Sequence, residues 1–110
     1  MPQFKHIVLL RFNPKTARED IAEIFETLDD LPEKVPGLLD VSSGVYDSPE
    51  GLHKGFTHGV VMTFADAESR DVYLHHPEHE RINQLMLEQL AGGLADLISF
   101  DFEASDRFRY

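Results

Sequence analysis

The fold of this chain can be read outward from the stretch FKHIVLLRF at residues 4–12. It contains β-branched, aromatic and aliphatic residues without Pro or Gly, which is typical of a β-strand. Side chains alternate along a strand, so one face carries the even positions Phe4, His6, Val8, Leu10 and Phe12. Ile7 and Leu9 lie on the opposite face, which makes both faces apolar. We therefore expect a strand that is covered on both sides.

A helix is expected next. Thr16 to Glu19 match a capping box, the pattern that opens many helices. The residues that follow form a single apolar stripe at helical spacing: Ile21, Ile24, Phe25, Leu28 and Leu31. Pro32 and the pair Pro36-Gly37 are expected to end this helix.

The rest of the chain predicts three more strands, at residues 38–46, 56–64 and 97–102, and two more helices. Asp66 is expected to cap a short helix that runs to about Leu74. The pair His76-Pro77 breaks it, because Pro is excluded from a helix interior but welcome in a first turn. The second helix follows Pro77 and ends near Gly92.

The order β-α-β-β-α-β predicts an α+β, ferredoxin-like fold with one antiparallel sheet and both helices on one side. Its sheet order is 4-1-3-2, which makes the first and third strands neighbours. His6 and His58 lie on corresponding faces of these strands and could face the same space. Ile7, Leu9 and Val61 would meet water on the other face. We interpret that face as the interface of a two-fold homodimer in which two sheets close into a barrel.

Length and composition set the outer limits. A chain of 110 residues is expected to form a single domain, residues 1–110. The formal net charge of −10 argues against a nucleic-acid partner, since binding to phosphates requires a basic surface. No apolar run is long enough for a membrane span, and no signal peptide is recognisable. Cysteine is absent, so we expect a cytoplasmic protein without disulfides or thiolate metal sites.

Candidate functional residues are concentrated in the stretch DVYLHHPEH at residues 71–79. It places Tyr73 close to three histidines, and these side chains can hold or move protons near neutral pH. A structural interpretation is also open: Pro77 could set a corner between two helices, with the rings of His76 and His79 acting only as caps.

The same stretch matches the H-x-x-E-H pattern of some zinc peptidases. That chemistry needs both histidines on one unbroken helix, which Pro77 interrupts. We therefore expect no metal site at these residues, and no ligand set for another ion can be named.

Three segments resemble the stress-responsive dimeric α/β-barrel (Dabb) family: residues 4–12, 55–64 and 73–79. The resemblance extends from Phe4 to Phe102 and keeps the order of the elements. It implies a ferredoxin-like homodimer whose two sheets face each other in a dimeric α/β barrel.

A plant polyketide cyclase in that family is similar at individual positions. His6, the pair Thr57-His58 and the pattern Tyr-x-x-His-Pro-x-His at residues 73–79 match its histidines and tyrosine. The resemblance implies that Tyr73 and His79 are the acid/base residues. It also implies that three other histidines bind substrate: His6, His58 and His76.

These residues predict binding of a small apolar carbonyl or aromatic compound, with acid/base chemistry that needs no cofactor. In an aldol closure, neutral His79 would remove a proton beside a carbonyl and Tyr73 would stabilise the enolate oxygen. Two alternatives are open: a non-catalytic, stress-induced homodimer with structural histidines, and a cofactor-free monooxygenase of the dimeric barrel superfamily. A cavity lined by His6, His58, Tyr73 and His79 would favour ligand binding, whereas tightly packed rings would favour the non-catalytic dimer.

Overall fold

The computed structural model describes residues 2–105. Its elements, in chain order, are β1 (Gln3–Leu10), α1 (Arg18–Asp29), α2 (Leu31–Lys34), β2 (Leu38–Val45), β3 (His58–Phe64), α3 (Ala67–Leu74), α4 (Pro77–Glu88), the short 3-10 helix η1 (Gly93–Asp96) and β4 (Leu97–Ala104). The four strands form one antiparallel sheet in the order β2-β3-β1-β4. The ferredoxin-like fold and the predicted sheet order are both confirmed.

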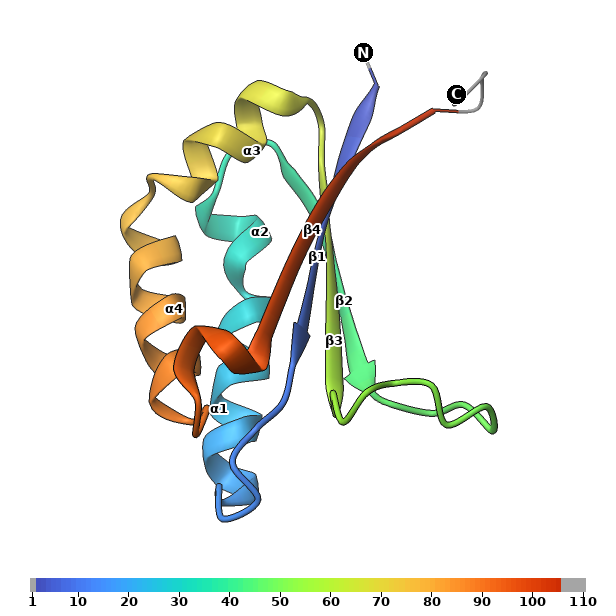
Figure 1. The fold of residues 1–110 in the computed structure, drawn as a ribbon. Coiled ribbons are helices and arrows are strands. Elements are labelled where there is room, and N and C mark those ends of the chain that lie inside the picture. Colours follow the sequence, from blue (N-terminus) through green and yellow to red (C-terminus); the bar gives the residue numbers. More distant parts are fainter. Residues whose placement is uncertain (1, 106–110) are drawn as a thin grey trace.

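The helices cover one face of the sheet and leave the other face uncovered (Figure 1). The hydrophobic core lies between the two layers. Even-numbered residues of β1 and β3 point into it, among them Val8, Leu10, Val60, Met62 and Phe64, all of which are buried. The helices contribute the other side of the core, with Ile24 and Leu28 from α1 and Ile82 and Met86 from α4. The strand alternation read from the sequence therefore decides which residues face the helices.

The start of α1 differs from the expected capping box. The helix begins at Arg18 and its N-cap is Ala17, which has no capping side chain. The Thr16 hydroxyl instead donates to the carbonyl of Gln89, 3.3 Å away, at the end of α4. The capping-box prediction was wrong because Thr16 is used for a tertiary contact between two helix ends.

The end of the first helix also differs. α1 stops at Asp29, and Pro32 lies in the first turn of the short helix α2 rather than terminating one long helix. Pro lacks a backbone N–H and therefore disrupts a helix interior. In the first turn of a helix the N–H groups have no intrahelical partner, so Pro is accepted there. Leu31 remains fully buried, because α2 continues the apolar stripe toward the sheet.

The corner between α3 and α4 follows the prediction closely. The Asp66 carboxylate accepts a hydrogen bond from the Ser69 N–H at 2.7 Å and caps α3. Pro77 opens α4, and the N-cap of α4 is His76. This sharp corner brings the end of α3 and the first turn of α4 over the same part of the sheet.

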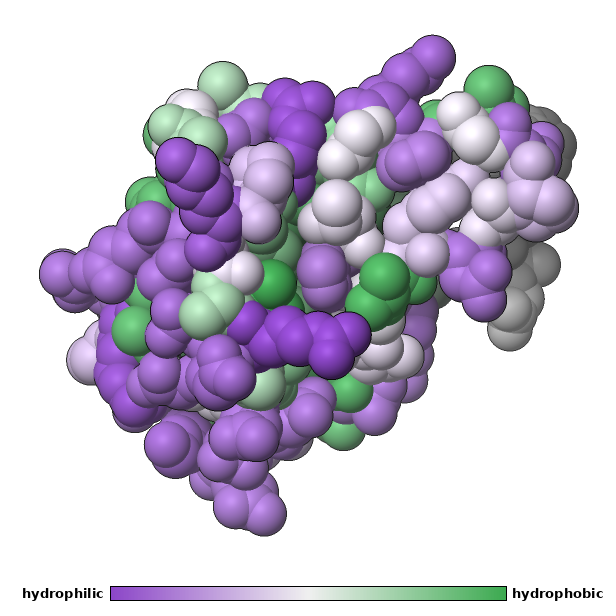
Figure 2. All heavy atoms as spheres, turned by 90° about the horizontal axis from the view of Figure 1, so that it is seen from below, coloured by the Kyte–Doolittle hydropathy of each residue, from purple (hydrophilic) through white to green (hydrophobic). Residues whose placement is uncertain are grey.

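One end of the molecule is mainly hydrophilic (Figure 2). Figure 2 shows the end of the molecule seen from below in Figure 1, where hydrophobic side chains emerge only between large hydrophilic areas. Apolar exposure on the uncovered sheet face is greater, since Ile98, Phe100 and Phe102 of β4 are all exposed there. Among residues 2–105, no helix has the length and apolar character needed to cross a bilayer.

Candidate functional site

A cavity of about 240 Å³ lies between the sheet and helices α3 and α4. Its wall is mostly aliphatic and includes Met side chains from both layers. The polar residues on the wall are His6, Tyr73, His79, Asn83 and Ser99. An apolar recess with a few converging polar groups is the usual form of a small-molecule site. Three of the sequence-predicted site residues therefore meet at one cavity.

His6 comes from the centre of β1 and is buried. Its Nδ1 lies 2.6 Å from Oδ1 of Asp101, the residue directly opposite on β4. The other carboxylate oxygen of Asp101 accepts from Arg70 Nη1 of α3 at 2.9 Å. The Arg70 guanidinium also lies 5.2 Å from the centre of the Phe4 ring. The His6 ring is thus held by Asp101 of β4, and Arg70 of α3 in turn holds that carboxylate.

Tyr73 comes from the last turn of α3 and is only 1% exposed. Its ring lies edge-on to the rings of His6, at 6.2 Å, and of His79, at 4.8 Å. No residue of the described range 2–105 forms a hydrogen bond with its hydroxyl. Burial raises the pKa of Tyr73, so the hydroxyl keeps its proton and can donate it to an oxygen in the cavity.

His79 comes from the first turn of α4, half-buried beside Tyr73. Burial is the main cause that lowers the pKa of His79, and the positive charge that His6 can carry acts in the same direction. A hydrogen bond with the Leu74 backbone opposes this shift. The ring is therefore neutral near pH 7, the form that accepts a proton. The Asn83 Nδ2 atom lies 3.3 Å from His79 Nε2.

His58 lies on the covered face of the sheet, as predicted, but not on this cavity. It pairs with Leu10, four residues along β1 from His6, which corresponds to about 13 Å of strand. Its ring stacks on Phe25 at 5.4 Å and meets the edge of Phe12 at 4.9 Å. Burial lowers the pKa of His58. The expectation that one space holds all four groups is thus wrong for His58.

His76 also lies away from the cavity. Its Nδ1 accepts the backbone N–H of Glu78 at 3.0 Å, which makes it the N-cap of α4. It borders a shallow surface recess with Val72, His75 and Pro77. The structural interpretation of the His-Pro-x-His unit therefore applies to His76, which caps a helix. The functional interpretation applies to His79, which reaches the cavity.

Three residues of the site had no recognisable motif in the sequence: Arg70, Asp101 and Asn83. Asp101 becomes a partner of His6 only through the register of β1 and β4. Asn83 follows His79 by four residues on α4, and that spacing was the one available signal.

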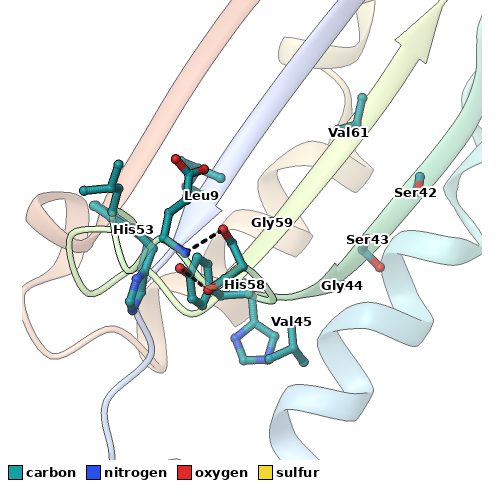
Figure 3. A pocket seen from close by; sticks show the side chains of 14 residues that line it. Leu9, Ser42, Ser43, Gly44, Val45, His53, His58, Gly59 and Val61 are labelled. Atoms are coloured by element: carbon teal, nitrogen blue, oxygen red, sulfur yellow. Dashed lines mark hydrogen bonds between the residues drawn. The ribbon is translucent and has the colours of Figure 1, made fainter.

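A second recess, of about 580 Å³, lies at the β2–β3 end of the uncovered sheet face. Figure 3 shows Leu9, Gly59 and Val61 along its floor, with β2 beside them and His53 on the loop. The rings of Tyr46 and His53 stack at 3.7 Å, and the Tyr46 hydroxyl donates to the Ser48 carbonyl. The loop is therefore held in place by its own contacts.

The zinc-peptidase pattern is not assembled. His75 ends α3 and His79 belongs to α4, so the two rings do not share one helix. Within residues 2–105, no three His, Cys, Asp or Glu side chains are grouped as a metal site would require.

Comparison with known proteins shows which family this chain is similar to. Residues 4–104 match the family described as Stress responsive A/B Barrel Domain (Dabb). The chain is 31% identical over 75 residues to olivetolic acid cyclase of Cannabis sativa, which covers 68% of this chain and 74% of the cyclase.

Solved structures agree in fold. A dimeric ferredoxin-like protein from Jannaschia sp. matches with a TM-score of 0.84 and 26% identity, over 93% of this chain and 99% of that one. Hydroxynitrile lyase from Passiflora edulis matches with a TM-score of 0.85, over 97% of both chains. Its identity is 17%, so that likeness concerns the fold alone.

Proposed function

The chain belongs to the stress-responsive A/B barrel domain family, and from this membership we propose that it binds a small apolar carbonyl or aromatic compound and performs cofactor-independent acid/base chemistry on it. The site is the cavity at His6, Tyr73 and His79. His79 acts as general base, and Tyr73 donates a hydrogen bond to the carbonyl oxygen. His6 orients the ligand from the opposite wall.

The observation that carries this proposal is the meeting of Tyr73 and His79. Their ring centres are 4.8 Å apart at one wall of an otherwise apolar cavity. One side chain stays protonated and the other stays neutral near pH 7, and burial causes both shifts. A donor and a base whose pKa values are pushed apart by their environment are a common acid/base arrangement.

The chemistry begins with proton abstraction beside a carbonyl. His79 takes the proton from carbon, and the electron pair of that C–H bond forms the enolate. The enolate oxygen accepts from the Tyr73 hydroxyl, whose donation is strongest when the oxygen carries charge. The enolate carbon then attacks a second carbonyl of the same molecule or takes back a proton. A positioned base contributes roughly 10²–10⁴-fold to such a step.

The similarity to olivetolic acid cyclase supports a cyclisation of this kind. The cavity volume limits the substrate, since pockets for drug-sized ligands measure about 300–1,000 Å³. At about 240 Å³, the cavity suits a compound of one ring or a short chain. The apolar wall favours an uncharged ligand body, with the carbonyl end directed at Tyr73 and His79.

The alternative of a non-catalytic protein predicts rings packed against one another with no space between them. A cavity beside Tyr73 and His79 favours ligand binding over that alternative. The His58 ring lies outside this cavity and packs against Phe12 and Phe25, which fits a structural role for that residue.

We further propose that two copies pair through the uncovered sheet faces. Ile7 and Leu9 of β1 share that face with Val61 of β3, because Ile7 and Val61 are paired across the ladder. Phe100 lies opposite Ile7 on β4 and is 61% exposed in a single chain. The similar protein from Jannaschia sp. is dimeric. Burial of this apolar face would form the barrel from two sheets.

Exchange of α-protons tests the proposal without knowledge of the natural substrate. Acetophenone is small and apolar, and its methyl protons exchange with solvent only through the enolate. We expect the protein to accelerate deuterium incorporation in D₂O, followed by proton NMR, and His79→Gln to lose most of that acceleration. Glu80→Gln, on the exposed side of α4, should exchange at the wild-type rate.

Native mass spectrometry of protein purified from its own host cells complements this assay. A retained organic molecule would identify the ligand class, and its loss in His79→Gln would place it at this cavity. Absence of exchange together with an empty protein would argue for the non-catalytic alternative.

A further inference from the structure

We propose that Asn83 is a positioning residue for His79: its amide holds the imidazole in the tautomer protonated on Nδ1, so that Nε2 is the nitrogen that faces the ligand as the base. This assignment deepens the proposed function and rests on it for its catalytic meaning. The orientation of the ring itself can be measured independently of any activity.

The two residues lie one turn apart on α4, where side chains at i and i+4 are neighbours. Asn83 Nδ2 lies 3.3 Å from His79 Nε2, and the ring also has a hydrogen bond with the Leu74 backbone. Because Nε2 faces Asn83, the Leu74 carbonyl is left to Nδ1. A carbonyl only accepts, so Nδ1 must carry the proton, and a neutral ring then offers a lone pair at Nε2.

The amide also disfavours the charged ring. With Nδ2 of Asn83 directed at the ring, a proton on Nε2 would face the N–H groups of the amide, and two donors cannot satisfy each other. The other groups facing His79 act in both directions: His6 of β1 and His75 at the end of α3 lower its pKa, and the Leu74 carbonyl raises it. Tyr73 is neutral because burial raises its pKa. Asn83 therefore adds to the groups that keep His79 ready to accept a proton.

The contact does not block the base. At 3.3 Å, it is longer than a strong hydrogen bond and correspondingly weak. Asn83 lines the cavity itself, so an entering carbonyl oxygen can take its N–H groups and free Nε2 for the neighbouring C–H bond. In this arrangement the Asn83 amide gives up its hydrogen bond with the His79 ring and donates to the ligand oxygen instead, as Tyr73 does.

Long-range ¹H–¹⁵N NMR of the histidine rings tests this directly, with the His79 signals assigned by their loss in His79→Gln. In the wild-type protein at pH 7.5, we expect the proton on Nδ1 and a bare Nε2. Asn83→Asp replaces the donor by a charged acceptor of the same shape. We expect the titration midpoint of His79 to rise by about one pH unit or more, as next to a carboxylate within hydrogen-bond distance.

Gln84→Glu is the matched control, because it adds the same charge at the next, exposed position of α4. It should shift the midpoint by only a few tenths of a unit, since solvent screens an exposed charge. A wild-type proton on Nε2 would overturn the assignment, as would equal shifts in the two variants. If Asn83→Asp does not fold, the wild-type spectrum decides. The predicted tautomer in a protein without exchange activity would refute the proposed function and leave the positioning role intact.

Discussion

His6 and Asp101 stand directly opposite each other on β1 and β4, and their side chains meet at 2.6 Å between Nδ1 and Oδ1. The second oxygen of Asp101 accepts from Arg70 of α3, so a helix is tied through this carboxylate to the histidine that borders the cavity. The same three residues therefore join the layers of the fold and fix one wall of the site.

Asp101→Ala should reduce the free energy of unfolding by about 1–3 kcal/mol, because a buried ring nitrogen and a guanidinium both lose their acceptor. Urea denaturation measures this loss. Asp71→Asn is the control, since Asp71 contacts the same Arg70 from an exposed position, where an ion pair contributes under about 1 kcal/mol. Equal losses in the two variants would show that the contact between His6 and Asp101 contributes no more to stability than an exposed ion pair does.

Tyr73→Phe should reduce the rate of the reaction and leave the stability of the protein nearly unchanged. The hydroxyl has no hydrogen-bond partner within residues 2–105, so its removal should change the free energy of unfolding by less than about 0.5 kcal/mol. The acetophenone exchange rate should fall by roughly 10²–10³-fold, as for the loss of one oxyanion donor. An unchanged exchange rate in a folded Tyr73→Phe protein would remove Tyr73 from the mechanism.

The sequence predicted the order of elements well because local periodicity and turn residues determine it. The prediction from sequence was weaker where a tertiary contact competes with a local rule. The Thr16 hydroxyl binds the Gln89 carbonyl instead of capping α1, and Pro32 lies in the first turn of α2 instead of ending a helix. Within the site, Tyr73 and His79 were recognisable because they share one short stretch. Asp101 was not, since its pairing with His6 depends on strand register, which a hydrophobic pattern fixes only to within two residues.

Stability should fall as the pH drops from about 7 to 5.5. Burial lowers the pKa values of His58 and His79 in the folded protein, whereas the unfolded chain binds protons near the ordinary value of about 6.5. The unfolded state therefore binds more protons in this window and gains from acidification. Chemical denaturation at several pH values gives the free energy of unfolding as a function of pH. Its slope should be smaller in His58→Gln and in His79→Gln than in the wild-type protein. An identical slope in wild type and both variants would contradict the assignment.

Gly37 should tolerate no side chain. Its φ of +82° is strained for other residues, and an added Cβ would overlap the side chain of Ser69 in α3. Gly51 has a similar φ of +68° but open space around it, which makes Gly51→Ala a control for backbone strain alone. We expect a loss of about 1 kcal/mol for Gly51→Ala and about 3 kcal/mol or more for Gly37→Ala. Ser69→Gly should recover part of the second loss, and its failure to do so would exclude the steric explanation.

Phe100→Glu should dissociate the proposed dimer. Phe100 extends from the middle of the edge strand β4 on the uncovered sheet face, opposite Ile7, and a charge there would be buried without a partner when two faces meet. Sedimentation velocity at micromolar concentration should change from dimer to monomer. Val72→Glu is matched to it, because Val72 is 49% exposed but lies on α3, on the helical side of the sheet. It should remain dimeric. A monomeric wild-type protein, or dissociation by both substitutions alike, would place the interface elsewhere and leave the apolar face of β4 without an explanation.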